Sequence, residues 1–330
     1  MSRASHLAIL IALSFSLKIS SPVYAIENAA SLEQQCRLNW FRYDHDLPLN
    51  ASLTPLDTTP TGVRYSLTYE SVHDQRVTAI LAMPLPSKFT APYPAVLLLH
   101  GSGGNKDSSY IKASAELLNS VGYAALSIDS QYAGARKRPD RSNDIFLPNS
   151  YTERDAWVQT VIDLRRAVDY LQTRKDINSH RLGYLGFSQG AMVGSVFGGV
   201  EKRVGVFCLA VPGGALLQVI MHIDRYPVLK AQWPIKITPE VMKIVRNVTQ
   251  ITDPIHYIGG ISPRPLLIIT AKYDEIIPAE SSAALIKAAR NDPKLVVKQI
   301  NSGHILNPEV IFTIRNWFQK ELGAVKSLQG

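Results

Sequence analysis

The chain has 330 residues, of which 46% are hydrophobic and 19% are charged. These proportions are typical of a globular protein with a sizeable core, and they exclude a disordered or fibrous chain. The formal charge is +8, but apart from Arg136-Lys137-Arg138 the basic residues are scattered, and no aromatic residues alternate with a basic stripe. We therefore expect no nucleic-acid partner.

Residues 1–25 have the pattern of a signal peptide. Arg3 gives a positive start, Leu7–Leu17 is an apolar run, and Val23-Tyr24-Ala25 supplies small residues that suit signal peptidase. Because the apolar run is short for a membrane span, an uncleaved anchor is the weaker alternative. We expect cleavage after Ala25, a secreted or periplasmic protein, and no stable membrane anchor after cleavage.

The two cysteines are Cys36 and Cys208. Cys208 lies in the apolar run Val204–Val211, where a buried free thiol is favoured and a disulfide bond with Cys36 is the alternative. Neither the cysteines nor any pair of histidines or carboxylates has metal-ligand spacing. We expect no metal and no cofactor.

Residues 26–61 show no regular pattern and contain three prolines, so we interpret them as an irregular N-terminal extension on the domain surface. The next two segments, Val63–Val72 and Arg76–Met83, are strand-like and are joined by a short polar connection. We expect them to form an antiparallel hairpin that opens the sheet of one domain, residues 62–325.

Short apolar runs alternate with helix-period segments along the rest of the chain. Continuous apolar runs are typical of strands that are covered on both faces. The predicted strands are Ala95–Leu99, Ala124–Ile128, Leu182–Phe187, Val204–Val211, Leu266–Thr270 and Leu295–Ile300. The predicted helices are Ser109–Ser120, Thr152–Thr173, Gly190–Gly198, Ala279–Ala289 and Pro308–Leu322. This alternation predicts an α/β fold with a doubly wound, mostly parallel sheet.

Residues 213–263 interrupt the alternation. A structureless loop of that length is uncommon in a compact domain, so we interpret the segment as a helical insertion. Gln218–Asp224 and Pro239–Val248 are its candidate helices. Because the insertion lies between two predicted strands, we expect it to form a lid over their carboxyl ends.

The stretch Gly186-Phe187-Ser188-Gln189-Gly190 ends one predicted strand and opens the next helix. A serine between two glycines at such a junction matches a nucleophile elbow, a sharp turn that presents the hydroxyl at the N-terminus of a helix. A structural turn is the alternative interpretation, since the pattern also occurs by chance. A serine nucleophile needs a base to remove its proton.

The sequence offers that base and an acid after two later strands. His304 follows the last predicted strand, and Asp274 follows the one before it. Strand ends of a parallel sheet meet at one edge, so Ser188, Asp274 and His304 are predicted to form a catalytic triad. Glu275 is adjacent to Asp274 and is the alternative acid.

Acyl transfer also requires hydrogen-bond donors for an oxyanion. Gln189 offers a backbone N–H from the elbow. The glycine-rich turn His100–Gly104 follows another predicted strand, and in it Ser102 is our first choice for the second donor and Gly103 the next. His100 is expected to hold this turn by hydrogen bonds and not to react.

Four other residues are weaker candidates for substrate contacts. Arg136 and Arg138 either belong to a solvated face or bind an anionic substrate through their guanidinium groups. Tyr226 and Trp233 lie in the insertion, where they would shape an acyl or leaving-group pocket. Asp129 ends a predicted strand, and we interpret it as a scaffold residue.

The elbow, the glycine-rich turn, Asp274 and the Ser302-Gly303-His304 stretch together resemble the α/β-hydrolase superfamily, over about Val63–Leu322. The opening hairpin and the sequence around Asp274 are similar to the branch that holds dienelactone hydrolases, acetyl xylan esterases and prolyl-oligopeptidase-like catalytic domains. Known dienelactone hydrolases carry a cysteine nucleophile, whereas this chain has Ser188.

The resemblance implies a serine hydrolase that cleaves small carboxylic esters, with acylated sugars and anionic esters among the candidate substrates. A peptidase or amidase and an acyltransferase are alternatives, because each uses the same triad. A non-catalytic binding module is less consistent with an intact set of Ser188, Asp274 and His304.

Overall fold

The computed structural model describes residues 22–141, 151–232 and 236–328. The chain divides into two units, residues 1–36 and 37–330. Helix α1 (Pro22–Asn39) crosses the boundary between them. The extension that we expected to be irregular therefore contains a helix. Most of the predicted signal peptide lies outside the described residues, and its cleavage stays a prediction.

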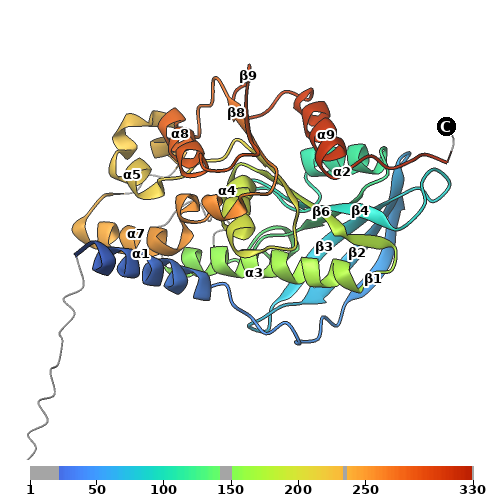
Figure 1. Cartoon of the computed structure of the whole chain (residues 1–330), viewed down its shortest axis with the longest axis horizontal. Helices are drawn as coiled ribbons and strands as arrows, with labels where there is room; N and C mark the ends of the chain where they lie inside the picture. The colour runs from blue at the N-terminus through green and yellow to red at the C-terminus, as the bar shows by residue number, and fades with distance from the viewer. Residues whose placement is uncertain (1–21, 142–150, 233–235, 329–330) are drawn as a thin grey trace, which may run out of the picture. The chain divides into compact units, whose positions relative to one another are not determined.

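Nine described strands form one sheet in the second unit (Figure 1), in the order β1-β2-β3-β5-β4-β6-β7-β8-β9. The strands are β1 (Ser52–Thr58), β2 (Gly62–Glu70), β3 (Arg76–Pro84), β4 (Tyr93–Leu99), β5 (Ala124–Ile128), β6 (Ile177–Phe187), β7 (Val206–Ala210), β8 (Leu266–Ala271) and β9 (Leu295–Ile300). The first three strands and the β3–β5 pair are antiparallel, and the other pairs are parallel. The mostly parallel sheet opened by an antiparallel hairpin is therefore confirmed.

Helices cover both faces of this sheet. They are α2 (Ser109–Asn119), α3 (Tyr151–Thr173), α4 (Gln189–Val200), α5 (Leu216–Met221), α6 (Pro227–Gln232), α7 (Pro239–Thr252), α8 (Ala279–Ala288) and α9 (Val310–Glu321). One buried cluster joins the sheet to α3, α4 and α8, and a second joins it to α2 and α9. This two-sided covering explains why the central strands are continuous apolar runs.

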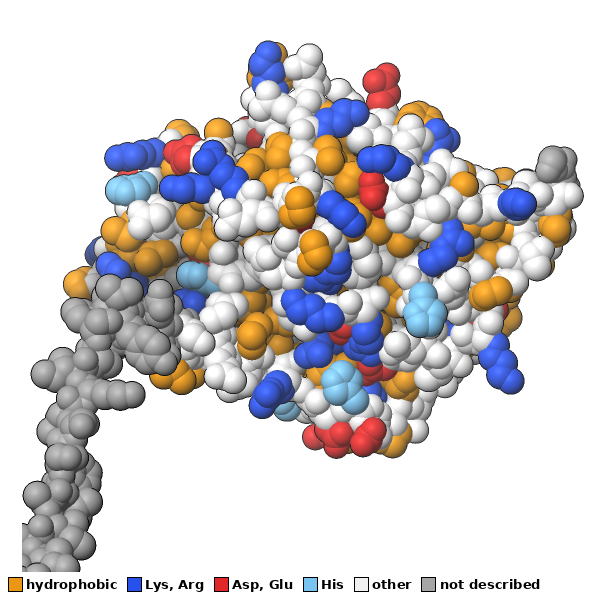
Figure 2. Space-filling view, in the orientation of Figure 1, with side chains coloured by type: hydrophobic (Ala, Val, Ile, Leu, Met, Phe, Trp, Pro, Cys, Tyr) orange, Lys and Arg blue, Asp and Glu red, His pale blue; other side chains and the backbone are white. Residues whose placement is uncertain are grey.

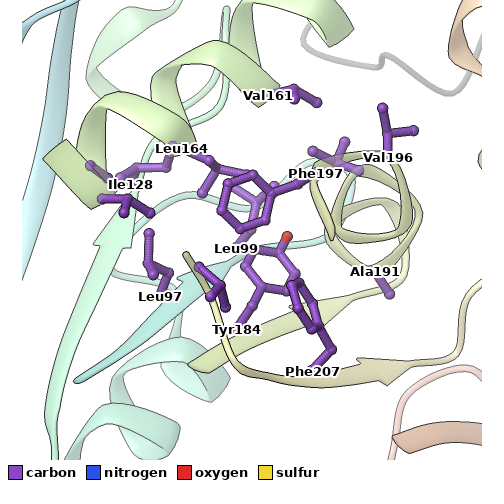
Figure 3. Close-up of a cluster of buried hydrophobic side chains, with 14 of the residues drawn as sticks. Leu97, Leu99, Ile128, Val161, Leu164, Tyr184, Ala191, Val196, Phe197 and Phe207 are labelled. Atoms are coloured by element: carbon purple, nitrogen blue, oxygen red, sulfur yellow. The ribbon is translucent and has the colours of Figure 1, made fainter. Parts of the chain in front are cut away.

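Aromatic side chains fill the core beneath the elbow helix (Figure 3). Phe197 of α4 packs among Tyr184 of β6 and Phe207 of β7, with ring centroids 5.2 and 6.4 Å away. The Tyr184 hydroxyl donates a hydrogen bond of 2.6 Å to the Gly190 carbonyl. This hydrogen bond and the aromatic packing hold the start of α4, where the elbow lies, against the sheet.

Strand β1 is another element that the sequence pattern did not reveal. It lies at the edge of the sheet and is largely exposed, so its sequence lacks the apolar signal of the inner strands. Its pairing with β2 shifts register between Pro55 and Asp57. Proline has no N–H to donate to a neighbouring strand, but an edge strand tolerates it. Pro55 therefore did not indicate irregular structure, contrary to our expectation for residues 26–61.

The insertion after β7 is helical, as predicted. Its longest helix, α7, begins at the predicted residue, where the Thr238 hydroxyl accepts a hydrogen bond from the Val241 N–H and Pro239 opens the first turn. The other candidate helix is divided between α5 and the short 3₁₀ turn Ile223–Arg225. Figure 1 shows these helices beyond one end of α3 and α4, away from α2 and α9.

The surface of the described chain carries no obvious single-sign patch on the face that Figure 2 shows, where Lys and Arg side chains are spread among other types. Both cysteines are free thiols, Cys36 exposed and Cys208 buried. Among the described residues, no helix is long and apolar enough to cross a membrane.

Candidate active site

Ser188 is the single residue between strand β6 and helix α4. Its backbone has φ +51° and ψ −116°, a conformation that costs a residue with a Cβ about 1–3 kcal/mol. Its N–H donates to the Ala210 carbonyl of the neighbouring strand at 2.8 Å. The strained conformation is therefore held by the sheet, and it projects the serine side chain beyond the strand end.

Two glycines permit this turn. A Cβ on Gly186 would overlap the carbonyl of Gly190, and a Cβ on Gly190 would overlap the carbonyl of Leu99. Backbone segments approach so closely here that no other residue type fits either position. The spacing of the two glycines about Ser188 is thus a steric requirement, as the elbow pattern predicted.

His304 connects Ser188 to a carboxylate. Its Nε2 lies 2.9 Å from Ser188 Oγ, and its Nδ1 lies 2.9 and 3.0 Å from the two carboxylate oxygens of Asp274. A carboxylate fixes Nδ1 as the donor, so Nε2 is left to accept from the serine hydroxyl. The three residues that the sequence pattern singled out lie together in one hydrogen-bonded chain.

The geometry also separates Asp274 from Glu275. Asp274 Oδ1 accepts the N–H groups of Ile276 and Ile277, at 3.0 and 2.8 Å, while facing the imidazole. Glu275 Oε2 instead accepts the backbone N–H of His304, at 3.0 Å. Of the two acids, Asp274 is therefore the one that contacts the ring of His304, and Glu275 holds the loop that carries His304.

The glycine-rich turn after β4 lies beside Ser188. Ser102 and Gly103 line the same cavity as Ser188, whereas the Gly101 N–H donates to the Tyr110 hydroxyl at 2.9 Å. Gln189 is the first residue of α4, so its N–H has no acceptor within the helix. The donors predicted for an oxyanion hole thus come from two elements that meet at the serine.

His100 holds this turn, as predicted. Its Nδ1 donates to the Gly101 carbonyl at 2.8 Å, and its Nε2 accepts the Ser130 N–H at 3.2 Å. Burial lowers the pKa of His100 below its ordinary value. The ring is neutral at neutral pH, and both of its nitrogens are used in the scaffold.

Asp129 anchors the other end of the same turn. Its carboxylate is fully buried and accepts the Lys106 N–H at 2.9 Å, the Lys106 Nζ at 2.7 Å and the Thr78 hydroxyl at 2.7 Å. Burial alone would raise the pKa of Asp129, but these hydrogen bonds and the lysine charge lower it overall. The scaffold role predicted for this residue agrees with its contacts.

A cavity of about 930 Å³ opens beside Ser188 and His304. It lies between α2 and α9, which run side by side (Figure 1), and under the loop that follows His304. Most of its walls are apolar, from Tyr110, Ala113, Phe187, Val211, Ile276, Ile305, Leu306, Val310, Ile311 and Ile314. Ser188 and His304 therefore face a mostly apolar cavity.

The weaker substrate-contact candidates lie elsewhere. The Arg136 guanidinium is buried against the Asp163 carboxylate at 2.6 Å, and Arg138 is exposed. The Tyr226 hydroxyl donates to Glu280 at 2.6 Å. These three do not line the cavity, so their role as substrate contacts has no support in this geometry and stays a prediction. Trp233 lies outside the described residues.

The insertion also contributes none of its described residues to the cavity, so its role as a lid has no support in this geometry. The pocket walls come instead from helices that the sequence pattern predicted correctly but left without a functional role. One signal was present in the sequence: Ile305 and Leu306 directly follow the triad histidine, and Ile305 is 88% exposed. Both residues line the cavity.

Metal binding has no evident site here. Within residues 22–141, 151–232 and 236–328, no three histidine, cysteine, aspartate or glutamate side chains are grouped to hold a metal ion. The chemistry available to this arrangement is that of a serine, a histidine, a carboxylate and backbone N–H donors.

Solved structures of esterases share this fold. An acetyl xylan esterase from Thermoanaerobacterium sp. JW/SL YS485 superposes with a TM-score of 0.67 at 15% identity, over 89% of this chain and 93% of that chain. An acetyl xylan esterase from Paenibacillus sp. R4 gives 0.63 at 16% identity, over 90% and 93%. A glucuronoyl esterase from Solibacter usitatus gives 0.61 at 14% identity, over 97% and 99%.

A curated relative is the Bacillus subtilis (strain 168) protein named "Putative hydrolase YtaP", which is 28% identical over 215 residues. The match covers 59% of this chain and 65% of the relative, so the chain spans less than two thirds of that relative's length.

Two family models match the chain across the site. The acetyl xylan esterase (AXE1) model matches residues 41–224, and the prolyl oligopeptidase family model matches residues 150–324. Each range is more than half of the chain, and together they include the elbow, the acid and the histidine. The dienelactone hydrolase part of the resemblance stays a prediction. The chain belongs to the acetyl xylan esterase (AXE1) and prolyl oligopeptidase families.

Proposed function

We propose that this enzyme cleaves small carboxylic esters through an acyl-enzyme on Ser188, with His304 as the base and Asp274 as its orienting acid. The observation that carries the proposal is the continuous hydrogen-bonded chain from the Asp274 carboxylate through His304 to Ser188 Oγ, at the wall of a cavity. Its 2.9 Å contacts are within the range expected between a nucleophile and its base.

In the first half-reaction, Ser188 Oγ attacks the ester carbonyl carbon while His304 Nε2 takes the serine proton. Asp274 stabilises the imidazolium and remains ionised. The backbone N–H groups of Gln189 and Ser102 donate to the carbonyl oxygen as it becomes negative, with Gly103 as the alternative second donor. Loss of one such donor costs about a hundred- to a thousandfold in kcat.

The tetrahedral intermediate then collapses and the bond to the alkoxy oxygen breaks. His304 Nε2 returns the proton to that oxygen, so the alcohol leaves neutral. A water molecule, deprotonated by the same nitrogen, attacks the acyl-enzyme and releases the carboxylic acid. Ser188 regains its proton and the cycle closes.

The direct test is Ser188→Ala, which should abolish hydrolysis of p-nitrophenyl acetate and labelling by a fluorophosphonate probe. Ser120→Ala is the matched control, because Ser120 is exposed at the end of α2 and bonds only locally, to the Leu117 carbonyl. Full activity in a folded Ser188→Ala protein would contradict the nucleophile assignment.

The names of the relatives support ester substrates, including acetylated and glucuronoyl sugar esters. A peptidase is the second candidate, favoured by the prolyl oligopeptidase family match over residues 150–324. Comparing kcat/KM for an aminoacyl anilide with that for the corresponding aminoacyl ester separates the two. A faster anilide would favour the peptidase.

We further propose that the enzyme is exported, secreted or periplasmic. The support is the positive start at Arg3, the apolar run Leu7–Leu17 and the small residues before Ile26. Expression of the full chain in a bacterial host, with fractionation and mass measurement, should give a product that begins at Ile26 outside the cytoplasm. A product that retains Met1 in the cytoplasmic fraction would overturn this proposal.

A further inference from the structure

The cavity beside Ser188 and His304 is large and mostly apolar. Among the described residues that line it, none is an aspartate, glutamate, lysine or arginine, and the titratable side chains are those of His304 and Tyr110. An anionic substrate would find no cation in these walls to compensate the loss of water around its charge. The cavity is therefore suited to a neutral group.

The cavity also offers little to the hydroxyl groups of a sugar. Two of its polar side chains are already used inside the protein: Ser114 Oγ donates to the Tyr110 carbonyl at 2.7 Å, and Asn307 Nδ2 donates to the Asn301 carbonyl at 3.1 Å. The Tyr110 hydroxyl accepts the Gly101 N–H. A site that selects a sugar would need polar groups directed at the ligand, whereas these three side chains are bonded to backbone groups of the protein.

The size of the cavity argues against a small acyl group alone. Ligand pockets range from about 300 to about 1,000 Å³, and the volume here is about 930 Å³. A water molecule takes about 30 Å³ of liquid, and an acetyl group has only three heavy atoms. An acetyl group would leave most of this apolar space in contact with water.

We propose that the cavity between α2 and α9 binds an extended, uncharged apolar group of the ester substrate, such as a medium-length alkyl chain or an aromatic ring. This inference rests on the proposed function, because it assigns the substrate class of the same site. It implies a preference different from the acetylated sugars that the names of the relatives suggest.

The first test is a panel of esters in two arms, which distinguish whether the apolar group belongs to the acid or to the alcohol. In one arm the alcohol is p-nitrophenol and the acid runs from acetate through butyrate to octanoate. In the other arm the acid is acetate and the alcohol runs from methanol to octanol, with acetylated xylose as the polar comparison. Each methylene that enters the cavity should raise kcat/KM roughly fourfold until the space is filled.

The second test alters the wall. Ala113 lines the cavity from an exposed position on α2, so Ala113→Phe should fill the space without disturbing the core. The ratio of kcat/KM for octanoate to that for acetate should fall at least tenfold. Ala283→Phe is the matched control, because Ala283 is an exposed alanine of α8 that is not among the lining residues, and its ratio should be unchanged.

A polar substitution gives an independent readout. Ile311 lines the cavity and its neighbour Phe312 is exposed and does not. Ile311→Asn should lower the same ratio by about tenfold, and Phe312→Asn should not change it. Both substitutions lie on one turn of α9, so a general effect on that helix would appear in both.

The outcomes separate this inference from the proposed function. Rising kcat/KM with apolar length in either arm supports the inference, and it is overturned if acetate or acetylated xylose is the best substrate while Ser188→Ala still abolishes activity. Failure of every ester, together with no fluorophosphonate labelling, would overturn both proposals. An unchanged ratio in Ala113→Phe and Ile311→Asn would also overturn the inference.

Discussion

Two aspartates at the same edge of the sheet have opposite uses. Asp129 follows β5 and Asp274 follows β8, and each accepts several hydrogen bonds. Asp129 is fully buried and every described partner is part of the scaffold, including the Lys106 ammonium. Asp274 directs its carboxylate to an imidazole whose far nitrogen reaches a cavity. The difference lies in the partner: the imidazole beside Asp274 has a second nitrogen that faces the cavity, whereas the described partners of Asp129 all belong to the scaffold.

Of the substitutions at these two aspartates, Asp274→Asn should have the larger effect on kcat. Without the charge, the imidazole loses both its tautomer preference and the stabilisation of its protonated form, and we expect kcat to fall about 10⁴-fold, as removal of a triad acid does in serine proteases. The free energy of unfolding, measured with urea, should change little because Asp274 retains an oxygen for the N–H groups of Ile276 and Ile277. A kcat within tenfold of the parent would show that Asp274 is not the triad acid.

Asp129→Asn should have the reverse profile. It leaves Lys106 beside a neutral amide, and breaking a buried pair of this kind costs about 3 kcal/mol. We expect a lower urea midpoint and, per folded molecule, a kcat within about tenfold of the parent. Because the pKa of Asp129 is lowered in the folded protein, the difference should persist above its ordinary pKa of 3.8 and shrink below it.

Asp253 is another buried carboxylate, and the charge of Arg37 offsets only part of the cost of its burial. Its oxygens accept the N–H groups of Ala215, Leu216 and Ile255, yet burial raises its pKa to about 6. An acid with a raised pKa stabilises the fold at low pH and loses that contribution as pH rises from its ordinary pKa to the raised one.

The parent should therefore lose about 2–3 kcal/mol of unfolding free energy between about pH 4 and about pH 6 relative to Asp253→Asn. The variant lacks the second oxygen that Leu216 uses, so it starts less stable, but its slope with pH should be smaller. Urea titrations at several pH values measure both slopes. Equal slopes would contradict the raised pKa.

Glu275→Gln should have the smallest effect on kcat. It tests the choice between Asp274 and its neighbour Glu275 as the orienting acid. The side chain still accepts the His304 N–H through its amide oxygen, so we expect a kcat within about tenfold of the parent. If this variant loses as much activity as Asp274→Asn, the orienting acid has been assigned to the wrong neighbour.

The parallel part of the fold could be predicted because its strands are apolar on both faces and its helices keep their period. The three residues of the hydrogen-bonded chain were predictable for a related reason: each follows a strand, and parallel strands end at one edge. Strand β1 could not be predicted, because an exposed edge strand that contains Pro55 has neither alternation nor an apolar run.

The cavity beside Ser188 was not predicted, for a different reason. Its walls come from α2, α9 and the loop after His304, which are distant in sequence, and their apolar residues look like ordinary core positions. A pocket was predicted at the insertion because residues 213–263 interrupt the alternation of strands and helices and carry aromatic residues. Arg136 was equally ambiguous, since a basic cluster does not reveal that Asp163 lies buried within reach of one member.

The left-handed backbone at the elbow has a consequence for how such enzymes lose function. Serine and alanine at position 188 both carry the backbone strain of about 1–3 kcal/mol. Glycine would avoid this strain, but it would lose about 0.5–1 kcal/mol of stability because its unfolded chain is more flexible. Ser188→Gly should therefore unfold at a higher urea concentration than Ser188→Ala. The fold would therefore be more stable with glycine than with serine at position 188. Stability does not favour the serine hydroxyl at this turn, so its presence reflects selection for catalysis.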